Sequence, residues 1–276
     1  MKNKFYLRSL ILLVFLFVIF LSAGCSRKKN ADLFCAAGSE EFSTLMDYAS
    51  YVLEKEAKIK FYYEGRGNHT GPVALRDSIC QVAAMTVPMS DSEMDALIKK
   101  GKKPIVFAVA AEALAIIVPV KDQRKEISFE ELEKLYGKQG GVYGVNSASE
   151  RYRFFKDSVL KGKNYSDKVI EVPGPLELVD RVSKSEHAAG YVRPAEATDK
   201  VKILPVRYKD LLIFPDEASV TTGKYPVSRY YYIYITEINE KNKILIELLL
   251  SDHFQKKLLS WGLFSLPVEK RNVFQK

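Results

Sequence analysis

Residues 37–71, AGSEEFSTLMDYASYVLEKEAKIKFYYEGRGNHTG, follow an apolar stretch and contain a glycine loop at each end. We expect a strand at residues 33–37, a helix at 43–55 and a second strand at 59–63, with another helix after Gly71. Unpaired backbone N–H groups and the positive end of a helix dipole meet where a strand passes into a helix, and such corners bind anions. Two corners on neighbouring parallel strands predict a cleft at the carboxyl ends of these strands.

The alternation of apolar runs and helix signals continues along the 276-residue chain and predicts α/β architecture. Further strands are predicted at residues 82–86, 105–111, 113–120, 142–145, 188–192, 201–206 and 229–236. Further helices are predicted at residues 72–77, 90–99, 128–136, 149–161, 176–185 and 240–261. The last is expected as one amphipathic helix. Ser147 and Glu150 have the spacing of a capping box, which would give both a purely structural role.

The first 24 residues have the features of a targeting segment. Three basic residues precede an apolar run at residues 10–21, which is too short to span a membrane. The small residues before Cys25 resemble a bacterial lipobox, although Ser22 stands where an aliphatic residue is usual. A lipobox implies a signal peptide at 1–24, a lipid anchor on Cys25, a polar tether at 25–30 and an extracytoplasmic location at the periplasm or cell surface. Ordinary signal cleavage with an incidental cysteine is the alternative.

The net charge bears on the kind of partner, and the cysteines bear on whether a disulfide forms. The formal net charge of +8 falls to +5 without the first 24 residues, which hold three basic residues and no acids. This excess suits an anionic ligand or surface, and solubility explains it equally well. Nucleic acid is not expected as a partner, because no arginine-rich stripe with interleaved aromatic residues occurs. Cys35 and Cys80 adjoin or lie in apolar strands, so we expect two buried free thiols, with a disulfide as the alternative.

Residue patterns typical of catalysis or metal binding do not occur in the sequence. His69, His187 and His253 are scattered, without cysteines or carboxylates at ligand spacing, so we expect no metal and no cofactor. The motifs GxSxG, HExxH and GxxxxGK[ST] are absent. Nothing in the sequence argues for an enzyme.

The order of short motifs resembles one family. The pieces are Ala37-Gly38-Ser39 (family AGST), residues 65–71 (GGGSGAG), 85–89 (ASRPL), Gly190-Tyr191-Val192, residues 222–229 (GKYPLSRP) and 248–255 (FVLSPEGQ). In this order and behind a lipobox, they resemble the phosphate-binding, PstS-type solute-binding lipoproteins of bacterial ABC transporters. The resemblance covers nearly all of residues 31–270.

The resemblance implies a two-lobed, periplasmic-binding-protein-like (type II) α/β fold with a hinge of two crossover strands. Lobe 1 would comprise residues 31–119 plus 222–276, and lobe 2 residues 120–221. Residues 112–120 and 229–236 would lie near the crossings. The ligand would be a small anionic solute, phosphate in this family, held by a monomer that closes by hinge motion and delivers it to a membrane ABC permease.

The resemblance also assigns pocket positions. In lobe 1, the family's phosphate-binding Thr falls on Glu40 and the residue after it on Glu41. The family's glycine-loop Ser falls on Asn68, and its group at the third corner falls on Thr86. In lobe 2, the family's Arg falls on Val145, and its Ser-Gly-Thr falls on Ser149, Glu150 and Arg151. Ser39 lies at the first corner. Loss of the arginine removes the family's bidentate oxyanion clamp.

Glu40 opposes anion binding at its implied position. A carboxylate about 4 Å from a phosphate oxygen costs about 4 kcal/mol at an effective dielectric near 20, roughly a thousandfold in affinity. Arg66 and Arg151 could offset this cost, because both fall on cleft-facing loops in this mapping. Three hypotheses stay open. Phosphate binds with Arg151 in place of the missing arginine, or the pocket takes another small ligand with a cationic group facing Glu40 or Glu41, or Glu40 pairs with Arg151 across the cleft of a scaffold or sensor that has no small ligand. Acids in the first helical turn also complement the dipole, which explains both glutamates structurally.

Overall fold

The computed structural model describes residues 33–271. The predicted signal peptide, the lipidation site Cys25 and the tether lie outside the described residues.

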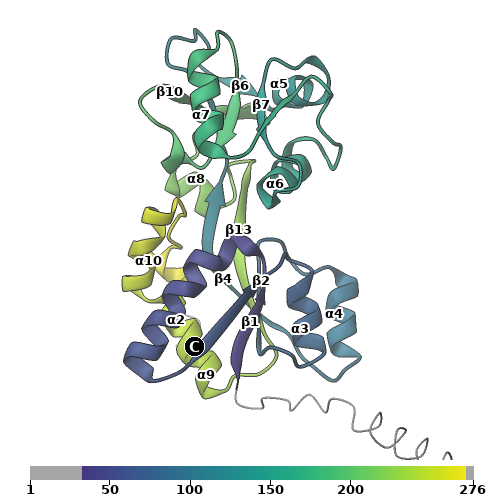
Figure 1. Ribbon diagram of the computed structural model, residues 1–276, viewed down its shortest axis with the longest axis vertical. Helices are drawn as coiled ribbons and strands as arrows, with labels where there is room; N and C mark the ends of the chain where they lie inside the picture. Colours follow the sequence, from purple (N-terminus) through teal and green to yellow (C-terminus); the bar gives the residue numbers. More distant parts are fainter. Residues whose placement is uncertain (1–32, 272–276) are drawn as a thin grey trace, which may run out of the picture. The chain divides into compact units, whose positions relative to one another are not determined.

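The described chain alternates strands and helices, as predicted (Figure 1). The strands are β1 (Phe34–Gly38), β2 (Phe61–Gly65), β3 (Val82–Met85), β4 (Ile105–Ala113), β5 (Ala115–Pro119), β6 (Ile127–Ser128), β7 (Tyr143–Val145), β8 (Ile170–Val172), β9 (Gly190–Val192), β10 (Val201–Leu204), β11 (Val206–Tyr208), β12 (Leu211–Ile213) and β13 (Ser228–Ile235). The helices are α2 (Ser43–Ala57), α3 (Thr70–Arg76), α4 (Asp91–Ile98), α5 (Phe129–Lys134), α6 (Glu150–Val159), α7 (Pro175–Lys184), α8 (Glu217–Thr221), α9 (Glu240–Leu250), α10 (Asp252–Leu258) and α11 (Val268–Arg271). Short turns of other helix types are η1 (Glu40–Phe42), η2 (Leu135–Gln139), η3 (Pro194–Glu196) and η4 (Leu259–Trp261).

Lobe 1, as we use the term, is the five-stranded sheet in the order β2-β1-β3-β13-β4 together with the helices packed on it. Strands β2, β1 and β3 are parallel, and β13 runs antiparallel to β3 and β4. Helices α2, α9 and α10 cover one face, where Phe42, Met46 and Leu249 join the buried side chains of the sheet. Helices α3 and α4 cover the other face (Figure 1). The parallel order brings the predicted strand ends to one edge of the sheet.

Lobe 2 is the group of three small sheets, β10-β5-β9, β12-β11-β6 and β7-β8, with α5, α6 and α7. Its core is rich in aromatic residues: Phe155 and Tyr191 stack with their ring centroids 4.0 Å apart, and Tyr136 packs beside both. Val145, which stands at the family's arginine position, is buried in this core.

The chain passes between the two groups of sheets next to Leu114, which separates β4 from β5, and next to Val227, which precedes β13. These crossings are hydrogen-bonded to each other, because Leu114 N donates to Val227 O at 3.0 Å and Tyr225 Oη donates to Leu114 O at 3.0 Å. Beyond the crossing, Arg229 of β13 lies opposite Glu112 of β4. The strand pairing therefore places two opposite charges beside the hinge.

Two sequence-based expectations were wrong. The predicted C-terminal helix 240–261 is broken, because Ser251 has an extended backbone (ψ 150°) and its Oγ accepts from Phe254 N, so that it begins α10. Cys35 and Cys80 form a disulfide and are not free thiols. Parallel pairing of β1 with β3 brings their Cα atoms within 5.0 Å, a spacing that a disulfide can bridge.

Candidate functional site

The first corner is formed by Gly38 and Ser39 at the end of β1. A Cβ on Gly38 would lie 1.8 Å from the backbone oxygen of Ala84, so only glycine lets β1 and β3 approach this closely. Ser39 is fully buried, and its N–H donates to Ala84 O at 2.8 Å. Its hydroxyl accepts from Glu41 N and donates to the carboxylate of Glu150 on α6.

The second and third corners are joined by Asn68. Its Nδ2 donates to Thr86 Oγ1 at 3.1 Å, and its Oδ1 accepts from Thr86 N at 2.7 Å. The same Nδ2 lies 3.4 Å from Glu150 Oε1, at the long end of hydrogen-bonding distance. Ser39, Asn68 and Thr86 are therefore brought together at one place, as predicted.

Unpaired backbone N–H groups were expected as the anion-binding donors at these corners, but several of them are hydrogen-bonded. The N–H groups of Arg66 and Gly67 both donate to Gly38 O at 2.9 Å, and Ser39 and Thr86 use theirs within the site. Four of the backbone N–H groups at these corners are therefore already hydrogen-bonded within the protein.

The corner before α6 also differs from the prediction. Ser149, and not Ser147, caps the helix: its Oγ accepts from Tyr152 N at 3.1 Å, whereas Ser147 N donates to Glu171 Oε2. The predicted capping box of Ser147 and Glu150 does not form. Ser149 is thus used locally, and the Glu150 side chain turns toward Ser39 and Asn68.

A buried group of charges, which was not predicted from the sequence, lies beside these donors. Glu112 is fully buried and accepts from Arg193 Nε and Arg229 Nε, both at 2.6 Å. Arg193 also pairs with Glu41 and donates to Tyr231 Oη at 3.1 Å. Burial alone would raise the pKa of Glu112, but the two guanidinium groups outweigh it and lower the pKa to about 2. The sequence signal for this charge group was the presence of Glu112 and Arg229 inside the apolar strands β4 and β13.

Arg229 links this charge group to the donors. Its Nη1 donates to Thr86 Oγ1 at 3.2 Å, and its guanidinium lies 4.3 Å from the ring centroid of Phe154 on α6. Its Nη2 is buried and lies 2.6 Å from Glu112 Oε2, so the Glu112 carboxylate holds the guanidinium at both Nε and Nη2. Nη1 is the nitrogen that reaches the cavity-lining Thr86.

The other predicted pocket residues lie elsewhere. Arg151 makes a bidentate pair with Glu196, with N···O distances of 2.8 and 2.9 Å, so the hypothesis that it pairs with Glu40 is wrong. Arg66 is 75% exposed and pairs with its neighbour Glu64. Glu40 is exposed. The carboxylate that meets the donors is that of Glu150.

A cavity of about 630 Å³ opens onto this group. Asn68, Thr86, Glu150 and Arg229 line it together with His69, Val87, Pro88, Arg153, Phe154, Asp157, Ser158, Ser228, Tyr230 and Tyr232. Volumes of several hundred Å³ are typical of ligand sites. The cavity therefore combines polar groups from both lobes at its inner end with aromatic walls.

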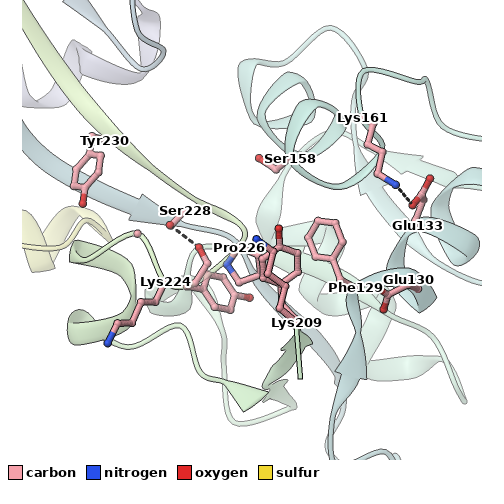
Figure 2. A pocket seen from close by; sticks show the side chains of 13 residues that line it. Phe129, Glu130, Glu133, Ser158, Lys161, Lys209, Lys224, Pro226, Ser228 and Tyr230 are labelled. Atoms are coloured by element: carbon pink, nitrogen blue, oxygen red, sulfur yellow. Dashed lines mark hydrogen bonds and ion pairs between the residues drawn. The ribbon is translucent and has the colours of Figure 1, made fainter. Parts of the chain in front are cut away.

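Figure 2 shows the residues that line a second cavity, of about 670 Å³. This cavity shares Ser158, Ser228 and Tyr230 with the first. Two of its lysines already have partners, because Lys161 donates to Glu133 at 2.8 Å and Lys209 lies over the ring of Tyr208.

Two further observations concern residues 33–271 alone. No group of three or more metal-binding side chains is found there, and none of the helices in that range is long and apolar enough to cross a membrane.

Known proteins share this fold and organisation. The phosphate-binding protein PstS of Pseudomonas aeruginosa is 25% identical over 268 residues, covering 85% of this chain and 83% of its own. The crystal structure of PstS from Borrelia burgdorferi matches with a TM-score of 0.72 and 20% identity, over 86% of this chain and 99% of that one. An ABC-type phosphate transport receptor from Vibrio cholerae matches with a TM-score of 0.72 and 18% identity, over 85% of this chain and 100% of that one.

These structural matches and the two groups of sheets confirm the predicted two-lobed α/β fold class. A family profile described as "PBP superfamily domain" matches residues 26–252, and the chain belongs to that superfamily. The predicted resemblance to the PstS-type family is confirmed as well.

Proposed function

We propose that this protein captures phosphate or a related small oxyanion in the cavity between its lobes and delivers it unchanged to a membrane ABC permease. The observation that carries the proposal is that Asn68, Thr86 and Arg229 line one cavity, with the buried Ser39 hydroxyl one contact away through Glu150. Hydroxyl, amide and guanidinium donors are the groups that bind oxyanions. The names of the PstS relatives support phosphate as the ligand.

In this proposal Arg229 provides the guanidinium that is missing at Val145. Arg151 cannot do so without giving up its bidentate pair with Glu196. Arg229 lines the cavity, and its Nη1 already reaches Thr86. Ser149 and Arg151 then act as supports of the α6 end and not as ligands.

The proposal extends to location and organisation. An oxidising compartment suits the Cys35–Cys80 disulfide, which supports an extracytoplasmic location. Lipidation of Cys25 and a monomeric state are parts of the same proposal. So is a division into two lobes, with the boundaries moved from the expected residues 119 and 222 to Leu114 and Val227, because β5 belongs to a sheet of lobe 2. Because capture needs no bond to break, no catalytic step is included.

The test is the thermal stability of the protein with inorganic phosphate, with sulfate and without either. A ligand at 100 times its Kd stabilises by about 2.7 kcal/mol, which raises Tm by roughly 5–10 °C in a chain of this size. Asn68→Ala should reduce the shift, and the exposed Arg66→Ala is the matched control that should keep it. A Tm that no oxyanion moves would contradict the proposal.

The alternative function is a binding-protein scaffold that acts as a sensor or surface interaction protein without phosphate. One observation favours it: the Glu150 carboxylate already accepts from the Ser39 hydroxyl and lies within reach of Asn68 Nδ2. A cleft that stays filled by its own carboxylate binds no anion, and the thermal-shift test separates the two functions.

A further inference from the structure

Glu150 makes contacts that its helix does not require. Its side chain reaches from α6 in lobe 2 to Ser39 and Asn68 in lobe 1, and the residue is 3% exposed. Ser149 already caps α6, so Glu150 is not needed for capping. A first-turn acid that only complemented the helix dipole would remain in water, as Glu240 does at the equivalent first position of α9.

The two carboxylate oxygens of Glu150 take up the donors that an oxyanion would use. Oε2 accepts from the Ser39 hydroxyl and Oε1 lies 3.4 Å from Asn68 Nδ2. The chain thus holds an anionic group of its own in the anion position.

We propose that the Glu150 carboxylate is a built-in occupant of the anion position, and that a solute anion binds by displacing it. This rests on the proposed function for the identity of the solute, but not for the occupancy itself. Glu150 then lowers the affinity of the cleft for anions, because an anion must replace the hydrogen bonds of Glu150 and bind near its negative charge.

The surrounding charges make this occupancy sensitive to pH. Burial raises the pKa of Glu150, the Ser39 hydrogen bond and Arg229 oppose that rise, and Glu41 and Glu40 add to it. Three more titratable groups line the same cavity: His69 before α3, and Arg153 and Asp157 on α6 itself. Tyr63 of β2 also lies near Glu150: burial raises the pKa of its phenol, and the charge of Glu150 adds to that rise. A protonated Glu150 no longer repels an anion, so displacement becomes easier as pH falls.

Occupancy is tested first without any solute. The melting temperatures of Ser39→Ala, Glu150→Ala and the double variant form a cycle. If the two side chains are in contact, the double variant should melt close to the less stable single variant. Additive losses would overturn the occupancy.

Displacement is tested by calorimetry with inorganic phosphate. The neutral, isosteric Glu150→Gln should lower Kd at least tenfold at pH 8, with a smaller gain at pH 5.5, and Glu150→Ala should act in the same direction. Glu240→Gln, a matched first-turn change outside the cleft, should leave Kd unchanged.

The outcomes separate the two proposals. If wild type and Glu150→Gln bind phosphate with equal affinity, the displacement inference is overturned. If no variant binds any oxyanion, the proposed function fails, and the solute-free cycle alone decides whether Glu150 occupies the site.

Discussion

Glu112 provides the sharpest test of the buried charge group. The replacement Glu112→Gln keeps the size of the side chain and removes its charge. It leaves the guanidinium groups of Arg193 and Arg229, now 2.6 Å from the carboxylate oxygens, without their shared anion. Arg193 retains Glu41, whereas Arg229 retains the Thr86 hydroxyl as an uncharged partner.

Two estimates of the loss agree. Removing one partner of a buried ion pair typically destabilises a protein by about 3–5 kcal/mol. The pKa of Glu112 falls from 4.5 to about 2 on folding, which corresponds to roughly 3 kcal/mol at neutral pH. Since the folded pKa is the lower one, this stability is present above pH 4.5 and is lost as pH falls toward 2.

The assay is urea unfolding at pH 7 and along a series from pH 5 to pH 2. Glu126→Gln is the matched control, because Glu126 forms an exposed pair with Arg207 that should contribute little to stability. Glu112→Gln should lose about 3 kcal/mol at pH 7 and show a flatter acid dependence than the control. A loss below about 1 kcal/mol, or the same acid dependence in both variants, would refute the reasoning.

Two further changes test the frame around the cleft. The Cys35–Cys80 disulfide joins residues 45 apart, so reducing it, or replacing both cysteines by serine, should cost about 4 kcal/mol in the chain-entropy account. A Tm unaffected by dithiothreitol would contradict this. Gly38→Ala should cost about 3 kcal/mol or abolish folding, because its Cβ would meet a backbone oxygen at 1.8 Å. Gly137→Ala, with open space around the new methyl group, should be tolerated, and equal Tm values for the two variants would count against the clash.

The order of strands and helices could be predicted because its signals are local. Apolar runs, caps and glycines lie within a few residues of the elements that they define. Local signals failed where two candidates competed: Ser147 and Ser149 are both plausible caps, and only the fold shows that Ser149 accepts from Tyr152 N. The break at Ser251 was hidden because the apolar pattern continues across it.

Part of the candidate site could be predicted, because strand ends also have local sequence signals. Ser39, Asn68 and Thr86 follow strands, and parallel pairing brings strand ends together. The charge group could not be found in this way, because Glu112 meets partners 81 and 117 residues away, Arg193 and Arg229. Such pairings depend on strand register and on the approach of the two lobes, which no short pattern encodes.

The position of Glu112 and Arg229 next to the chain crossing has a consequence for solute release. Both residues lie two positions from the linked Leu114 and Val227, whereas Arg193 comes from lobe 2. We expect a rotation that separates the lobes to separate Arg193 from Glu112 and Glu41, which belong to lobe 1. These buried ion pairs would then oppose opening of the proposed cleft, in addition to the contacts that a captured solute makes.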